Sequence, residues 1–248
     1  MPGLSSLLDM IFPPRCVVCQ RVGAAVCASC LGSMQPPAVP ICACCGQSIR
    51  ATTDPASGVC PDCANGRGPK HLDGVRVAAT YVGAVRPAIL ALKFRGQRRV
   101  AECLAPLMAV PFQSDILTAD IVIPVPLHAS RRRERGYNQA ELLARAFAKS
   151  QGLSVGADLL VRARATEAQT HLSRAERLHN VAGAFALADP IVAKTIAGRR
   201  ILLVDDVTTT GSTLDAAAEP LRAAGAVSVW GLAFARPVAG GSDAGDTP

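Results

Sequence analysis

Two adjacent carboxylates and a loop rich in hydroxyl groups form the segment of this chain best suited to chemistry. The segment Ile201-Leu-Leu-Val-Asp-Asp-Val-Thr-Thr-Thr-Gly-Ser-Thr213 is an apolar run that leads into Asp205 and Asp206 and then into the loop. Because ligands of open α/β sheets bind beyond the carboxyl ends of the strands, we expect a site here. The loop offers backbone N–H groups, hydroxyls and the positive end of a helix to one anion.

The two carboxylates require a different partner, because they would repel a phosphate held by the loop. They suit the neutral diol of a ribose beside that phosphate, where they could accept hydrogen bonds from the 2′ and 3′ hydroxyls. They would also face the positive charge of an oxocarbenium-like ribosyl transition state. The alternative is an ordinary strand-to-helix turn with capping hydroxyls. The order of the acids and the loop favours the ligand site.

This segment resembles the phosphoribosyl-diphosphate motif of type I phosphoribosyltransferases. The resemblance implies that Asp205 and Asp206 are catalytic residues that hold the ribose. It also implies that the loop binds the 5′-phosphate through Thr209, Thr210, Gly211, Ser212 and Thr213. The ligand of such a site is phosphoribosyl diphosphate with Mg²⁺, or a nucleotide.

Cysteine pairs dominate the N-terminal part of the chain, where nine of its 10 cysteines lie. Eight form four CxxC pairs: Cys16/Cys19, Cys27/Cys30, Cys42/Cys45 and Cys60/Cys63. A CxxC turn directs two thiolates at one point, and two such turns complete a tetrahedral zinc site. We therefore expect two structural Zn²⁺ ions, with pairs matched either in sequence order or interleaved. Redox-active or disulfide-bonded cysteines are the alternative.

Two further cysteines and one histidine are not part of the four CxxC pairs. Cys44 is a spare thiol that leaves the membership of the third pair open, and His71 is a weak alternative ligand at the edge of the module. Cys103 falls in an apolar helical run, so we expect it in the core.

A basic segment follows the expected strand at Asp120–Pro126. In the enzymes that the motif resembles, the loop after this strand receives pyrophosphate, which implies that role for Val125, Pro126 and Leu127. Four arginines come next, Arg131, Arg132, Arg133 and Arg135, and we expect a mobile loop that closes over the pyrophosphate. Guanidinium groups bind phosphate oxygens in bidentate fashion. A solvated basic run or a nucleic-acid patch remains open.

Other polar residues near these segments allow two interpretations each. Lys93 could approach a phosphate from the side. Alternatively, it could simply lie at the end of a surface helix, where its positive charge interacts favourably with the helix dipole. Asn138 and Gln139 could cap the next helix or contact substrate. The residues from 166 to 180 could cover the site as a hood, or form a plain capped helix.

Strand-like and helical runs alternate from residue 73 onward, which predicts a mostly parallel sheet with helices on both faces. Strands are expected at 75–82, 120–126, 158–164, 199–204 and 227–235, and helices at 86–94, 101–110, 138–152, 173–183 and 211–225. The fold class is therefore α/β, a sheet of the type I phosphoribosyltransferase kind preceded by a small Cys-rich zinc-ribbon module. We place a short helix and the double zinc ribbon in 1–70, the α/β domain in 71–237, and a disordered tail in 238–248.

The whole chain resembles the ComF/GntX family of competence-associated proteins. Besides the motifs above, the segments 81–96, 124–144 and 166–185 carry the likeness. It implies an association with DNA uptake, with single-stranded DNA and the uptake machinery as partners. Three functions remain open: a phosphoribosyltransferase whose acceptor no residue identifies, a non-catalytic nucleic-acid module, and a sensor of phosphoribosyl diphosphate.

The composition of the chain limits the partners and the location that it could have. The net charge of +7 suits a polyanionic partner, but aromatic residues make up only 4%, fewer than a base-stacking platform usually has. The N-terminus lacks the basic start and cleavage site of a signal peptide, and apolar runs are too short to span a membrane. We expect a cytoplasmic protein whose thiols stay reduced.

Overall fold

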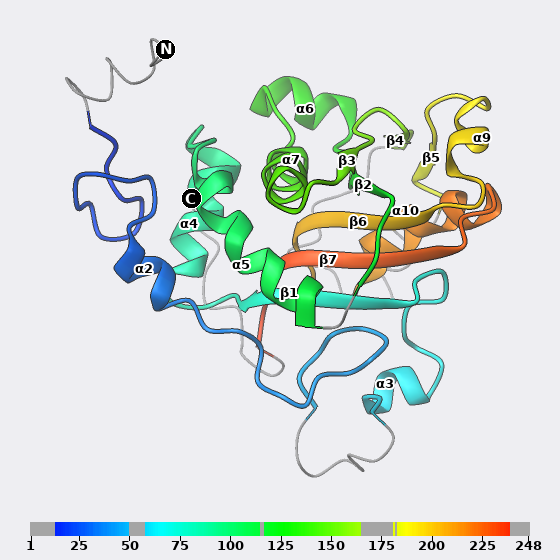
Figure 1. Cartoon of the computed structure of the whole chain (residues 1–248), viewed down its shortest axis with the longest axis horizontal. Helices are drawn as coiled ribbons and strands as arrows, with labels where there is room; N and C mark the ends of the chain where they lie inside the picture. Colours follow the sequence, from blue (N-terminus) through cyan, green and yellow to red (C-terminus); the bar gives the residue numbers. More distant parts are fainter. Residues whose placement is uncertain (1–12, 50–57, 115–116, 165–180, 182, 239–248) are drawn as a thin grey trace.

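The computed structural model describes residues 13–49, 58–114, 117–164, 181 and 183–238 (Figure 1). The expected N-terminal helix, the hood segment from 166 to 180 and the tail after residue 238 lie outside these ranges. No helix within the described ranges is both long enough and apolar enough to cross a membrane.

A five-stranded sheet, parallel throughout, forms the centre of the molecule (Figure 1). Its strands in spatial order are β1 (Gly74–Thr80), β7 (Ser228–Arg236), β6 (Arg200–Val207), β2 (Ile121–Pro124) and β3 (Ser154–Val155). The predicted parallel sheet is confirmed. The central strands β6 and β7 are buried almost throughout, as expected for strands covered on both faces, and each contains a long apolar run.

Helices cover both faces, because side chains alternate along each strand. On β6, Leu202 and Val204 join a core with α4 (Val85–Phe94), α5 (Val100–Ser114) and α7 (Gln139–Gln151). Ile201 and Leu203 point the other way, into a core shared with α9 (Val192–Ile196) and α10 (Ser212–Ala223). One strand therefore holds two helical layers in place and carries the paired acids at its end.

Two shorter elements lie beyond this sheet. The strands β4 (Leu160–Arg162) and β5 (Phe185–Leu187) pair antiparallel and form a separate small sheet. The arginine segment forms helix α6 (Ala129–Arg135), so the expectation of a loop is wrong. His128 caps α6 by accepting from Ser130 N, and Gly136 ends it in the left-handed conformation at φ 76°.

The cysteine-rich part, with its short helices α2 (Ala28–Gly32) and α3 (Pro61–Ala64), packs on the edge strand β1. Thr80 N donates to Gln35 O at 2.8 Å, and Val26 and Met34 belong to the same core as α5. Gly46 has φ 70°, and a Cβ there would lie 2.5 Å from Val75 O. Only glycine therefore allows this approach, which covers the otherwise open edge of the sheet.

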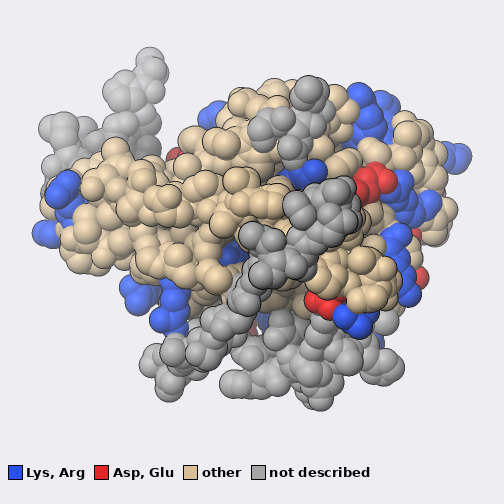
Figure 2. Space-filling model, turned by 90° about the horizontal axis from the view of Figure 1, so that it is seen from below, with Lys and Arg blue, Asp and Glu red and all other residues tan. Residues whose placement is uncertain are grey.

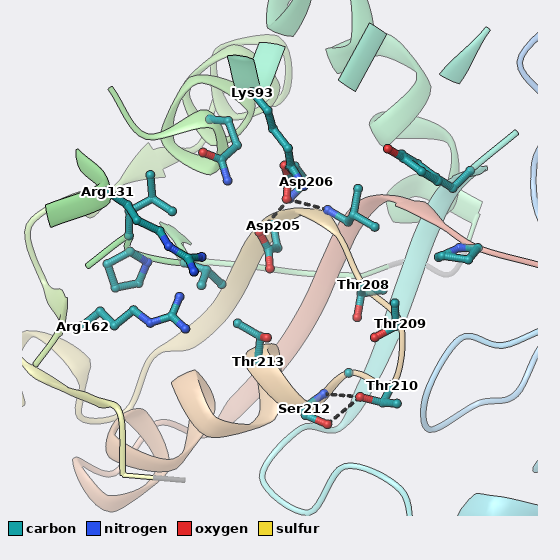
Figure 3. A pocket seen from close by; sticks show the side chains of 18 of the residues that line it. Lys93, Arg131, Arg162, Asp205, Asp206, Thr208, Thr209, Thr210, Ser212 and Thr213 are labelled. Atoms are coloured by element: carbon teal, nitrogen blue, oxygen red, sulfur yellow. Dashed lines mark hydrogen bonds and ion pairs between the residues drawn. The ribbon is translucent and has the colours of Figure 1, made fainter. Parts of the chain in front are cut away.

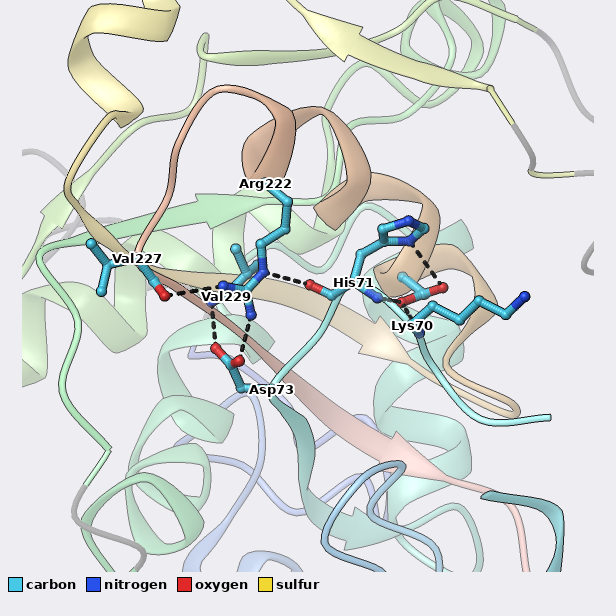
Figure 4. A network of polar contacts seen from close by, with 7 residues as sticks. Lys70, His71, Asp73, Arg222, Val227 and Val229 are labelled. Carbon is cyan, nitrogen blue, oxygen red and sulfur yellow. Dashed lines mark hydrogen bonds and ion pairs between the residues drawn. The ribbon is translucent and has the colours of Figure 1, made fainter. Parts of the chain in front are cut away.

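A polar network ties the link between the two parts to α10 (Figure 4). Asp215 Oδ1 accepts from Lys70 N at 2.7 Å and from His71 N at 2.6 Å. Arg222 donates to His71 O at 2.9 Å and pairs with Asp73 at 2.5 Å. The Nδ1 atom of His71 lies 3.4 Å from Asp215 Oδ2, so the suggestion that His71 is a zinc ligand is wrong.

Candidate functional site

The eight paired cysteines form two separate clusters in sequence order. One holds Cys16, Cys19, Cys27 and Cys30, and the other holds Cys42, Cys45, Cys60 and Cys63. The Sγ atoms of Cys19 and Cys27 are 3.6 Å apart, and those of Cys45 and Cys60 are 3.7 Å apart. Four sulfurs at about 2.3 Å from a tetrahedral zinc ion would be separated by about 3.8 Å. Both clusters therefore fit a closed structural Zn²⁺ site, and the interleaved pairing is excluded.

The two remaining cysteines take no part in these clusters. Cys44 is half-buried beside the second cluster, and burial raises the pKa of its thiol. Cys103 lies in α5 and packs against the main hydrophobic core, as predicted.

A pocket of about 330 Å³ opens where β2 and β6 end (Figure 3). Pro124 pairs with Val204, and Val125 N donates to Val204 O at 2.9 Å, so the two strands end side by side. The predicted residues that line it are Asp205, Asp206, Thr209, Thr210, Gly211, Ser212, Thr213, Val125, Pro126, Leu127, Arg131 and Arg135. Arg132 and Arg133 lie on α6 but do not line the pocket.

The hydroxyl loop is held in a fixed shape at the start of α10. Thr208 N donates to Ala235 O at 3.0 Å, which anchors the loop to β7. The hydroxyls of Thr210 and Ser212 are 2.5 Å apart, and Ser212 N donates to Thr210 Oγ1 at 3.3 Å. Gly211 precedes the helix with φ 84°, a conformation that favours glycine. The loop and the N-terminus of a 12-residue helix thus converge on the pocket.

The two acids have different surroundings. Asp205 Oδ1 accepts from Asp206 N, whereas Asp206 Oδ1 accepts from Val207 N, both at 2.8 Å. Asp206 Oδ2 lies 3.0 Å from Lys93 Nζ. Burial, reinforced by the charge of Asp206, raises the pKa of Asp205 to about 8. Burial disfavours a charged Lys93, but the adjacent Asp206 prevails and raises the pKa of the ammonium group.

Arginines surround the rest of the pocket. Arg135 donates to Gln139 Oε1 at 2.5 Å and lies over the Phe94 ring at 5.1 Å. Arg162 also lines the pocket, and burial together with the charge of Arg131 lowers its pKa. In Figure 3, Arg131 and Arg162 extend into the pocket from separate elements. Sequence reasoning missed Arg162, since it reads there as the end of an ordinary strand.

Asn138 acts as the predicted cap. Its Oδ1 accepts from Ala140 N and its Nδ2 donates to Val125 O, each at 3.0 Å. The side chain is buried and does not line the pocket. Instead it braces the loop of Val125, Pro126 and Leu127 against the start of α7.

These features define a protein class: a phosphoribosyltransferase-type α/β domain that carries a double zinc ribbon. Family models agree on both parts. A double zinc ribbon domain matches residues 7–64, and a phosphoribosyl transferase domain matches residues 135–240.

Curated relatives identify the family. Competence protein F of Haemophilus influenzae is 29% identical over 232 residues, which cover 89% of this chain and 97% of that protein. DNA utilization protein YhgH of Escherichia coli is 31% identical over 211 residues, covering 77% and 89%. Competence protein ComFC of Bacillus subtilis is 30% identical over 206 residues, covering 79% and 77%. The chain belongs to this competence protein F (ComF/GntX) family.

Solved structures match only in part. The allosteric regulatory enzyme of purine biosynthesis is 21% identical with a TM-score of 0.39, covering 59% of this chain and 30% of that one. Glutamine phosphoribosylpyrophosphate amidotransferase from B. subtilis is 20% identical with a TM-score of 0.38, covering 58% and 30%. This chain therefore spans less than a third of either enzyme.

Proposed function

We propose that this protein binds phosphoribosyl diphosphate, or a nucleotide with the same ribose 5-phosphate, in the pocket at the ends of β2 and β6. The observation that carries the proposal is that Asp205 and the hydroxyl loop line one cavity. The loop and the α10 N-terminus suit a 5′-phosphate. Asp205 suits the ribose hydroxyls beside it.

The two acids differ in whether they could bind Mg²⁺. Among the described residues, Asp205 Oδ2 has neither a hydrogen-bond nor an ion-pair partner, whereas Asp206 accepts from Val207 N through Oδ1 and forms an ion pair with Lys93 through Oδ2. Magnesium is usually held by one or two carboxylates together with substrate phosphates and waters. The donors present thus fit an ion that the diphosphate carries and that Asp205 meets directly or through water. Such an ion would neutralise part of the diphosphate charge.

The reaction that this site would support is transfer of phosphoribose to an acceptor. A nucleophilic atom of the acceptor would bond to C1 of the ribose while the C1–O bond to diphosphate breaks and pyrophosphate leaves. Positive charge develops on the ribose in that step, and a carboxylate at Asp205 would stabilise it. Arg131 and Arg135 would bind the departing pyrophosphate. None of the described residues that line the pocket identifies the acceptor.

A second candidate function is binding of single-stranded nucleic acid at the mouth of the same pocket. Phe94 is 70% exposed there, with Arg135 over its ring, and exposed Arg132 and Arg133 lie on α6. An exposed ring suits a base, and the arginines suit phosphates. The face seen from below in Figure 2, away from α6, mixes basic side chains with uncharged and acidic ones in its described part and presents no continuous basic track there. The names of the relatives, competence and DNA utilization, support a role in DNA uptake, which we place in the cytoplasm.

Calorimetric titration separates these functions. Phosphoribosyl diphosphate with Mg²⁺ should bind the purified protein, and a pyrophosphate-release screen over nucleobases would then reveal turnover. A single-stranded oligonucleotide in place of the sugar ligand tests the second candidate. If neither phosphoribosyl diphosphate nor a nucleotide binds, the pocket assignment is wrong.

A further inference from the structure

The ion pair between Lys93 and Asp206 distinguishes the two acids of the motif. The Lys93 side chain is 24% exposed and lines the pocket, while that of Asp206 is only 5% exposed. Asp206 is the only ion-pair partner of Lys93 among the described residues. An ammonium group has three hydrogens to donate, so Lys93 can hold Asp206 and still contact a ligand.

The position of Lys93 indicates which part of a ligand it would meet. Figure 3 shows Lys93 reaching Asp206 from the side opposite the loop of Thr209 to Thr213. A ribose 5-phosphate with its phosphate in that loop and its ring beside Asp205 directs its C1 substituent away from the loop. In phosphoribosyl diphosphate that substituent is the diphosphate, which would then lie on the side of Lys93 and Arg131.

We propose that Lys93 contacts the diphosphate of the bound ligand, that Asp206 is the positioning residue that aims Lys93, and that Asp205 alone receives the ribose. This inference rests on the proposed function and assigns separate roles within it. Burying an unpaired ammonium group is costly, and Asp206 offsets that cost before a ligand arrives. Without Asp206, Lys93 would be free to turn toward solvent.

The test compares two ligands that differ only in the diphosphate. Phosphoribosyl diphosphate and ribose 5-phosphate are titrated with Mg²⁺ into the wild type, Lys93→Met, Lys93→Arg and the double variant Lys93→Met/Asp206→Asn. A charged hydrogen bond that is lost weakens binding about ten-fold or more. We expect Lys93→Met to lose that much affinity for phosphoribosyl diphosphate and much less for ribose 5-phosphate. Lys93→Arg should restore most of the affinity.

The double variant separates contact from simple neutralisation, because removing both partners leaves the net charge of the pocket unchanged. If Lys93 contacts the diphosphate, the double variant stays as weak as Lys93→Met. If Lys93 only neutralises Asp206, the double variant returns to wild-type affinity and the proposal is wrong. Lys149→Met, an exposed change on α7 outside the pocket, is the matched control and should bind both ligands normally.

The outcomes also distinguish this inference from the function on which it rests. A wild type that binds neither ligand overturns the phosphoribosyl site itself. A wild type that binds both, with Lys93→Met unchanged for phosphoribosyl diphosphate, overturns only the role of Lys93. Thermal unfolding of each variant shows whether the change has unfolded the protein, and Lys93→Arg keeps the test decisive if Lys93→Met does not fold.

Discussion

The guanidinium group of Arg236, at the end of β7, donates a hydrogen bond to the backbone carbonyl of Cys45 in the second cysteine cluster. Arg236 is buried, and its burial lowers the pKa of the guanidinium group while the adjacent cysteines oppose that shift. The neighbours of Arg236 connect it to the pocket: Ala235 O accepts from Thr208 N, and Thr208 and Pro237 both line the cavity. One short segment therefore joins the second zinc ribbon to the ligand site.

The first prediction concerns zinc content. Elemental analysis of the purified protein should give close to two Zn²⁺ ions per chain, because both clusters have four thiols at tetrahedral spacing. Cys19→Ser and Cys45→Ser should each bind about one ion. Cys45→Ser should also lower affinity for phosphoribosyl diphosphate, since its ribbon contacts Arg236. A wild type with a single zinc ion would contradict the assignment of two sites.

The second prediction concerns the arginines of α6. The double variant Arg132→Ala/Arg133→Ala should leave phosphoribosyl-diphosphate binding unchanged, because these residues do not line the pocket. It should weaken binding of a single-stranded oligonucleotide and flatten its salt dependence, as each lost phosphate contact releases one counterion fewer. Fluorescence anisotropy at several salt concentrations measures this slope. An unchanged slope would show that neither side chain contacts the oligonucleotide.

The third prediction concerns the pH dependence of stability. Asp205 has a pKa of about 8 in the folded protein and about 3.9 when unfolded, so the folded state holds its proton more tightly. Its contribution to stability is present below about pH 3.9 and is lost as the pH rises through about 8. Asp205→Asn cannot titrate. In urea unfolding, the stability of the wild type relative to Asp205→Asn should therefore fall between pH 5 and pH 9, and a constant difference would contradict the raised pKa.

The fourth prediction tests the contact between the ribbon and the sheet. Gly46→Ala should destabilise the protein more than Gly66→Ala, although both glycines have a positive φ near 70°. Both variants carry the left-handed backbone cost of about 1–2 kcal/mol. Only the Cβ at residue 46 meets Val75 O, at 2.5 Å, whereas nothing lies within 4 Å at residue 66. Chemical denaturation of the two variants gives the comparison, and equal losses would show that the ribbon adjusts freely.

Sequence patterns predicted the features that depend on neighbouring residues. The apolar run before Asp205 and the glycine at residue 211 each specify local backbone, and the predicted strand and loop are present. The CxxC pairs likewise identified the zinc ligands. Their matching into clusters depends on the path of the chain between pairs, which spacing alone does not determine.

Features that depend on contacts between residues far apart in the sequence were not predicted. Arg162 enters the pocket because β4 pairs with β5 across more than twenty residues of chain. The arginine segment forms a helix capped by His128 and Gly136, whereas the resemblance to phosphoribosyltransferases had implied a mobile loop. The boundary near residue 70 stays a prediction, and the network of Asp215 and Arg222 around it has no sequence signature.

The central claim is that a ribose binds beside Asp205 at the end of β6. Selectivity for the 2′ hydroxyl of the sugar tests this claim most directly. Ribose 5-phosphate and 2-deoxyribose 5-phosphate carry the same charge, so their comparison isolates the hydroxyl that Asp205 would bind. Measured at pH 9, above the pKa of about 8 that burial gives Asp205, the wild type should prefer ribose 5-phosphate by about ten-fold, the effect of one charged hydrogen bond, and Asp205→Asn should lose most of that preference. Equal affinity of the wild type for both sugars, or an unchanged preference in Asp205→Asn, would contradict a ribose site at the end of β6.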